Sequence, residues 1–146
     1  MHITKYTDYS LRTLMYLALQ PAGELASIAD ISATFDISRN HLMKIVTDLA
    51  NLGLINSVRG RGGGISLGLR ADQINIGRLM RRIEPNEAIV DCDSGPCLFQ
   101  EVCVLSQAIE DAKDAFFAEL DKYSLADLVK QKASLERVIR MQQLQI

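Results

Sequence analysis

The sequence contains no apolar stretch long enough to cross a lipid bilayer, which takes about 20 consecutive apolar residues. Its first residues also lack the basic segment followed by an apolar core that marks a secretory leader. Internal repeats and low-complexity stretches are absent too. These absences exclude a membrane-spanning protein and favour a cytoplasmic one. With 146 residues and 48% hydrophobic content, we expect one globular domain.

Cysteine is scarce and unevenly placed, with only Cys92, Cys97 and Cys103 in the whole chain. An odd number of cysteines cannot all pair within one chain. The spacing C-x4-C-x5-C also lacks the C-x2-C pair of most structural zinc sites and of thiol redox motifs. Three widely spaced thiolates on a loop can surround an object larger than one ion. We therefore favour an iron–sulfur cluster, which usually takes four protein ligands and so needs a fourth from elsewhere.

Other interpretations of the cysteines stay open. One is a zinc site completed by a carboxylate or a histidine, and another is a set of redox-reactive thiols without any metal. Inert cysteines are disfavoured, because structural free cysteine is normally buried among apolar residues. Here Asp91, Asp93 and Ser94 surround the first thiol instead.

The net charge of −2 hides an asymmetry between the two parts of the chain. Residues 1–82 contain ten basic and six acidic residues, which gives +4, whereas residues 83–146 contain six basic and twelve acidic residues, which gives −6. A basic first part beside an acidic second part suggests that only one end of the molecule meets a polyanion.

Apolar residues at helical spacing predict a first helix over residues 8–19, with Thr7 or Asp8 as its N-cap. Ser27 and Ser38 are placed to cap two further short helices, and Gly53 to end the second of them. Two short helices separated by a tight turn form a helix-turn-helix.

Two β-prone runs, 54–58 and 65–67, flank a glycine-rich segment, which predicts a hairpin. A hairpin directly after a helix-turn-helix is a wing. Further helices are expected over 76–83, where Pro85 ends the pattern, over 104–122, from Ser124 onward, and over 130–146. The expected fold class is mainly α with a small β-hairpin wing.

Polar and basic side chains gather at the start of the helix after Ser38 and at the hairpin tip. Residues in the first turns of a recognition helix meet base edges in the major groove, where Arg39 suits guanine and Asn40 suits adenine. The hairpin arginines suit a minor groove or the DNA backbone. The candidate DNA-binding residues are Ser38, Arg39, Asn40, His41, Lys44, Arg59 and Arg61. The alternative is a solvated helix start and a flexible basic turn, against which the hairpin and the local positive charge argue.

Enzymatic motifs are not evident. No nucleotide-binding glycine motif follows a strand, and no nucleophile–base pair is apparent, so a redox enzyme or electron carrier has little support. We expect a protein that is not an enzyme.

Several motifs resemble those of the Rrf-type family of winged helix-turn-helix regulators, most closely its nitric-oxide-sensing repressors. The resemblance covers about residues 1–130 and rests on five segments in the same order. They are the opening TKYTDYSLR at 4–12, SRNHLMKIV at 38–46, the wing VRGRGGGI at 58–65, the cysteine loop, and YSLADL at 123–128.

The resemblance implies a homodimer that pairs through the helix over 104–122 and binds an inverted-repeat operator. It also implies a [4Fe–4S] rather than a [2Fe–2S] cluster on the three cysteines, with Asp8 of the other subunit as the fourth ligand. Nitric oxide would damage the cluster and release the operator. Regulators that sense cluster status, iron or oxidants on the same scaffold are the alternative.

One departure from the pattern helps to choose among relatives. Regulators of cluster assembly in this family carry a histidine three residues after the last cysteine, where this chain has Ser106. Another type carries a histidine in the first helix, where this chain has Arg12. We expect three regions: a winged helix-turn-helix at 1–83, a cluster-binding loop at 84–103, and a dimerisation helix with a helical tail at 104–146.

Overall fold

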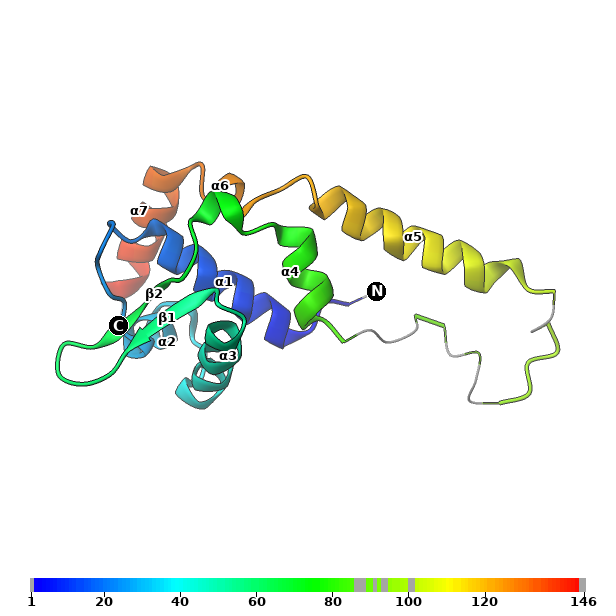
Figure 1. Cartoon of the computed structure of the whole chain (residues 1–146), viewed down its shortest axis with the longest axis horizontal. Coiled ribbons are helices and arrows are strands. Elements are labelled where there is room, and N and C mark those ends of the chain that lie inside the picture. Colours follow the sequence, from blue (N-terminus) through cyan, green and yellow to red (C-terminus); the bar gives the residue numbers. More distant parts are fainter. Residues whose placement is uncertain (1, 86–88, 91, 93–94, 100–101, 145–146) are drawn as a thin grey trace.

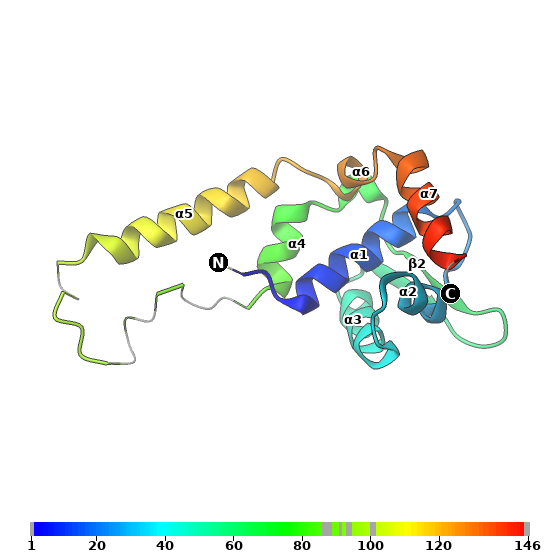
Figure 2. The same ribbon diagram turned by 180° about the vertical axis from the view of Figure 1, so that it is seen from behind.

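The computed structural model describes residues 2–85, 89–90, 92, 95–99 and 102–144. Most helices pack into a body around α1, and the long helix α5 extends from that body (Figures 1 and 2). The cysteine loop joins α4 to the far end of α5. Seven α-helices with one two-stranded hairpin confirm the expected fold class in the described part of the chain. No helix among these residues is long and apolar enough to span a membrane.

Helix α1, Lys5–Leu19, runs through the centre of the body. It begins three residues before the predicted start, because Thr4 is its N-cap and accepts a hydrogen bond from the Thr7 backbone N–H. The prediction that Thr7 or Asp8 caps this helix is therefore wrong. Asp8 lies inside the first turn, where a carboxylate is favoured by the helix dipole without capping.

The helix-turn-helix consists of α2, Ile28–Phe35, and α3, Arg39–Asn51. Ser27 and Ser38 cap these helices as predicted, each accepting a bond from the backbone N–H three residues ahead. Asp36 makes the turn between them with φ of 51°, in the left-handed region. Gly53 follows α3 with φ of 73°, which is the predicted helix stop.

The predicted wing is confirmed. Strands β1, Ile55–Val58, and β2, Gly64–Leu67, pair antiparallel, with Ile55 opposite Leu67 and Val58 opposite Gly64. A bridge between Ala26 and Ile65, with N···O distances of 2.8 and 2.9 Å, ties the wing to the residues just before α2.

A short 3-10 helix η1, Ala71–Gln73, leads into α4, Ile76–Ile83. After the cysteine loop come α5, Val104–Leu120, α6, Leu125–Leu128, and α7, Lys132–Gln143, so the tail is helical as predicted. Helix α6 packs on α1, and α7 packs on α2, where Gln143 donates to the Thr34 hydroxyl.

The core lies where α1, the helix-turn-helix, the wing and α4 meet. Its buried side chains repeat at the spacing that the sequence predicted for each helix face. They include Leu14, Leu17, Ile31, Ile37, Leu42, Ile45, Leu49, Ile55, Ile65, Ile74, Ile76, Leu79, Met80 and Leu125. No residue of α5 is fully buried, although Phe116, Phe117 and Leu120 pack half-buried against this core.

Candidate nucleic-acid interface and cysteine loop

The predicted recognition residues lie together at the start of α3. Ser38 is committed to its own helix, because its hydroxyl accepts the His41 backbone N–H at 3.3 Å. The side chains of Arg39, Asn40, His41 and Lys44 are all exposed over the first two turns. The structure thus presents four polar side chains to solvent at one end of this helix, in the arrangement that a base-reading helix requires.

Two tyrosines of α1 hold the recognition helix, and sequence reasoning did not single them out. The Tyr6 hydroxyl donates to Asp48 Oδ2 at 2.8 Å, and the Tyr9 ring lies 6.5 Å from the His41 ring. Burial, with the bond to Asp48, raises the pKa of Tyr6 to about 12, so this hydroxyl stays a donor at neutral pH. Tyr6 and Tyr9 are three residues apart and so lie on one face of α1, which was the available signal in the sequence.

The wing tip carries Arg59 and Arg61 between glycines. Gly60 and Gly62 have φ of 101° and 78°, which side-chain-bearing residues rarely adopt. At Gly63 a Cβ atom would collide with the Val58 carbonyl oxygen and lie 2.9 Å from that of Gly60. The tip therefore needs its glycines to turn tightly, and it holds both arginines exposed.

The predicted cations are free to meet an external anion. Among the residues that the structure describes, no ion pair includes Arg39, Lys44, Arg59 or Arg61. Lys44 also faces a hollow of about 550 Å³ whose wall includes Arg82 of α4. Arg82 is thus a further cation close to the recognition helix, which the sequence analysis did not single out.

The three cysteines lie on the segment that connects α4 to α5. Cys97 is exposed, Cys92 and Cys103 are half-buried, and all three are free thiols. Cys103 is the N-cap residue of α5, and its side chain makes no capping hydrogen bond. Within the described part of this single chain, no three metal-ligating side chains converge on one point. Asp91, Asp93, Ser94 and Glu101 lie outside the described residues.

The donor set nevertheless fits an iron–sulfur cluster better than a hard cation. Three unpaired thiols stand within one short connection, and thiolate sulfur is the ligand that such clusters take. Cys103 also begins a helix of 17 residues, whose positive dipole end favours an anionic complex.

Asp8 lies on the exposed side of α1 and is 41% exposed at its side chain. Its carboxylate pairs with Arg12, with Nε–Oδ1 and Nη2–Oδ2 distances of 2.9 and 2.8 Å. An exposed pair of this kind, four residues apart on a helix, is worth only about 0.3–0.5 kcal/mol. Asp8 can therefore exchange this partner for another at small cost.

Glu84 joins the start of α1 to the end of α4, and nothing in the local sequence indicated it. Its carboxylate accepts the Thr4 backbone N–H at 2.9 Å, the Thr4 hydroxyl at 3.0 Å, and the Thr7 hydroxyl. Pro85 and the cysteine loop follow directly. One carboxylate thus fixes the helix that carries Asp8 to the point where the loop begins.

Comparisons with known proteins agree with this geometry. Residues 3–131 match the Rrf2 family, described as iron-dependent transcriptional regulators. The HTH-type transcriptional regulator NsrR of Bacillus subtilis (strain 168) is 44% identical, with 98% of this chain and all of that protein covered.

Solved structures of regulators show the same fold. Staphylococcus aureus CymR is 30% identical, with 86% of this chain and 95% of that one covered and a TM-score of 0.68. The oxidized form of the same CymR has a TM-score of 0.70 at 30% identity, over 88% of this chain and 95% of that one. T. potens IscR, 24% identical with 90% and 88% covered, has a TM-score of 0.71 and supports the fold alone. The chain therefore belongs to the Rrf2 family and is a winged helix-turn-helix transcriptional regulator, not an enzyme.

Proposed function

We propose that this chain is a homodimeric repressor that holds its operator while a [4Fe–4S] cluster occupies the cysteine loop, and that nitric oxide releases the operator. One observation carries the proposal: three free thiols lie on the segment that joins the DNA-binding body to an unburied helix. The sequence resemblance to nitric-oxide-sensing repressors and the 44% identity to a regulator named NsrR support the same function.

The exposed surface of α5 supports dimerisation through this helix. Val104 and Leu105 are 76% and 59% exposed, and no residue along the 17-residue helix is buried. A soluble helix with an apolar stripe normally buries that stripe against another element. A second copy of α5 provides such an element, and a two-fold dimer would bind an inverted repeat.

In the DNA complex, we assign base contacts to Arg39 and Asn40 and supporting contacts to Ser38 and His41. Lys44 and the wing arginines Arg59 and Arg61 would contact phosphates or the minor groove. The support for these roles is that all four cations are exposed and unpaired among the described residues. Such contacts to phosphate make affinity fall steeply with salt.

We assign Cys92, Cys97 and Cys103 as three cluster ligands and Asp8 of the partner subunit as the fourth. Within one chain, Asp8 belongs to the body, whereas the described loop residues extend away beside the far end of α5 (Figure 1). Completing the ligand set between two chains would therefore tie sensing to the dimer. The carboxylate is the weakest member of this set, because iron–sulfide centres favour sulfur ligands.

When bound, the cluster would supply iron that reacts with nitric oxide. In this chain, the residues that respond are those around Asp8. A freed Asp8 would pair with Arg12 as in this structure, and the first two turns of α1 carry Tyr6 and Tyr9, which contact α3. A small shift of α1 would then move the recognition helix. Dimers need half-sites about 34 Å apart, so such a shift weakens binding, and about 3 kcal/mol corresponds to roughly 150-fold.

The test begins with protein purified without air. We expect a brown protein with about four iron and four sulfide per chain, as the [4Fe–4S] type requires. Duplexes selected from a randomised library by this protein should be released when nitric oxide changes its absorption spectrum. A colourless, metal-free protein that binds the same duplexes equally well under all conditions contradicts the proposal.

A second candidate function is a cluster-free thiol switch on the same scaffold. The exposure of Cys97 favours it, and the similar CymR was solved in an oxidized form. Under this alternative, DNA binding changes reversibly with a thiol oxidant and a reductant in metal-free protein, and Cys97→Ser abolishes the change. The cluster proposal expects no such response once iron is absent. Sensing of iron or cluster status would instead show as a response to iron supply without nitric oxide.

A further inference from the structure

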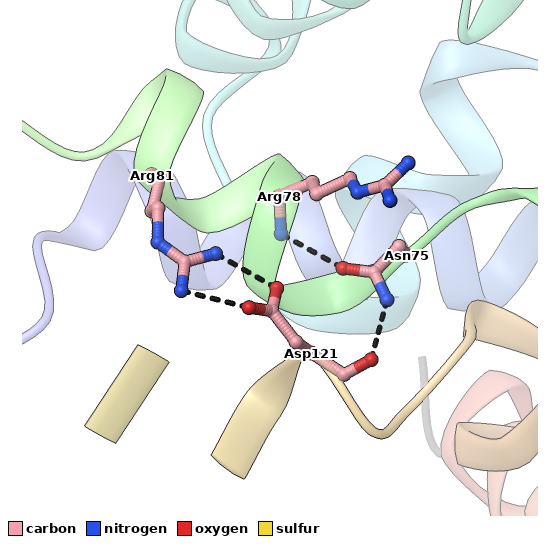
Figure 3. A network of polar contacts seen from close by, with 4 residues as sticks. All are labelled: Asn75, Arg78, Arg81 and Asp121. Atoms are coloured by element: carbon pink, nitrogen blue, oxygen red, sulfur yellow. Dashed lines mark hydrogen bonds and ion pairs between the residues drawn. The ribbon is translucent and has the colours of Figure 1, made fainter. Parts of the chain in front are cut away.

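The base of α5 is fixed to α4 by a set of contacts that neither the sequence nor the site above explains. The Arg81 guanidinium grips the Asp121 carboxylate through two bonds of 2.7 and 2.8 Å (Figure 3). The Asn75 side chain donates to the Asp121 carbonyl oxygen at 2.6 Å and accepts the Arg78 backbone N–H at 2.9 Å. The Arg81 guanidinium also lies 5.1 Å from the centre of the Phe117 ring.

Gly77 lets the two helices meet at this point. A Cβ atom there would collide with the Asp121 carboxylate and lie 2.7 Å from the Asp121 nitrogen and 2.8 Å from the Phe117 carbonyl oxygen. Two of these three atoms are backbone, which has no rotamer by which to escape. Only glycine therefore permits the observed approach of α4 and α5. We call Asn75, Gly77, Arg81 and Asp121 the α4–α5 clamp.

Beyond the clamp, Phe116 and Leu120 of α5 pack half-buried against the core, and no residue of the helix is fully buried. Two backbone bonds, Ile76 N–Tyr123 O at 2.9 Å and Leu125 N–Ile74 O at 2.8 Å, secure the chain just after it. Toward its middle, a hollow of about 390 Å³ is lined by Glu84 and Pro85 after α4 and by Glu110 and Asp114 of α5. A helix of this length is about 25 Å long, so a 5° change at its base moves its free end by about 2 Å.

We propose that the α4–α5 clamp sets the direction in which α5 leaves the DNA-binding body, and thereby the operator spacing that the dimer selects. This inference rests on the proposed dimerisation through α5. The residues of the clamp are positioning residues, because they act through the helix and need no contact with DNA. A two-bond guanidinium–carboxylate pair suits this role, because its fork geometry fixes orientation as well as distance.

The exposure of the pair separates this role from simple stabilisation. The Arg81 and Asp121 side chains are 40% and 38% exposed, and ion pairs at such positions add little to stability. The bonds to Arg81 lower the pKa of Asp121, so both partners remain ionised at neutral pH. Loss of the pair should therefore make the angle between α4 and α5 more variable without unfolding the chain.

The experiment measures spacing preference directly. Half-sites are first selected by the cluster-loaded wild-type protein from randomised duplexes, and are then rebuilt as inverted repeats with spacers shortened or lengthened by one or two base pairs. Asp121→Asn should lower the preference for the best spacer over its neighbours by about two- to fivefold. Gly77→Ala, which must displace α5, should move the preferred spacer and weaken the original one by about tenfold or more.

Glu119→Gln is the matched control, because it removes the same charge from an exposed position on α5 outside the clamp. It should leave the spacing profile unchanged, and all three variants should sediment as dimers with the wild-type cluster content. Wild-type profiles for both clamp variants would overturn the inference, as would a monomeric Asp121→Asn. If Gly77→Ala does not fold, Asp121→Asn alone decides. If the wild-type protein is monomeric, or binds all spacers equally well, the proposed function is wrong, whatever the variants do.

Discussion

Two regions of this molecule, a body and an arm, differ in how far their side chains are buried. In the body, formed by α1 to α4, the wing, α6 and α7, side chains such as Leu14, Ile31 and Leu49 are fully buried. In the arm, formed by the cysteine loop and α5, no residue of the helix is buried and Cys97 is exposed. The buried side chains of the body come from one chain, whereas we propose that the exposed apolar face of the arm is covered by a second copy. Four predictions use this difference, from the largest expected effect to the smallest.

The strongest contrast should come from leucines in the two regions. Leu49→Ala in the body removes a side chain that is fully buried, and should lower the free energy of unfolding by about 2–5 kcal/mol. Leu105→Ala in the arm should change it by less than about 0.5 kcal/mol in dilute monomer. Urea denaturation measures both values.

In sedimentation, which measures self-association, Leu105→Ala should have the larger effect of the two substitutions. Leu105→Ala should weaken self-association, because its side chain lies on the apolar face of α5, whereas a folded Leu49→Ala should still dimerise. Equal destabilisation of the monomer by both changes would show that the arm is already packed within one chain.

The next effect concerns DNA recognition by the body. Arg39→Ala should cost about 1–3 kcal/mol of discrimination at one base step of each half-site, because one guanidinium–guanine contact is lost. Lys44→Ala is the control, since loss of a phosphate contact should weaken binding evenly across sequences and flatten its salt dependence. Competition binding with single-base operator variants tests this, and unchanged discrimination rules Arg39 out as a base-reading residue.

Tyr6→Phe tests the link between α1 and α3 inside the body. Loss of the 2.8 Å bond to Asp48 should lower the free energy of unfolding by about 1 kcal/mol at most, because water can replace part of the bond at this partly exposed site. Since the folded pKa of about 12 lies above the usual 10, this contribution is complete below pH 10 and is lost as pH rises through 12. Wild type should therefore lose more stability than Tyr6→Phe between these pH values. Parallel curves would show that the bond contributes nothing.

The smallest effect on stability, and the sharpest on sensing, is expected at Asp8. Asp8→Ala and Arg12→Ala both remove the same exposed ion pair and should each cost about 0.3–0.5 kcal/mol. Only Asp8→Ala removes the proposed cluster ligand. It should lose its cluster faster under air and respond differently to nitric oxide, as followed by absorption. Identical behaviour of the two variants would leave Asp8 a helix residue with no part in the cluster.

Local signals predicted most of the fold. The caps Ser27 and Ser38, the helix stop at Gly53 and the glycine-rich wing each depend on residues within a few positions, so the sequence displays them directly. The start of α1 was misplaced although Thr4 is a common N-cap residue, and the carboxylate that supports Thr4, Glu84, lies 80 positions away. No periodicity reveals such a contact.

The site divides in the same way. The types and spacing of the cysteines and of the exposed cations are visible in the sequence, and their roles in binding a cluster and DNA remain predictions. Tyr6, Glu84 and the pair Arg81–Asp121 escaped notice, because each acts across 40 or more residues and the chemistry of each is ordinary until its partner is known. Geometry that links distant segments has to be seen in three dimensions.

The carboxylate of Glu84 has a consequence for the length that the cysteine loop can take. Because it fastens the end of α4 to α1 immediately before Pro85, the segment beyond it begins from a fixed point. The α4–α5 clamp fixes the end of α5 to the body in the same way, through Asp121. Inserting or deleting loop residues between two fixed ends changes the free energy of folding only slightly, because the entropy of loop closure changes slowly with length. The length of the cysteine loop can therefore change with little effect on the body that carries α3 and the wing.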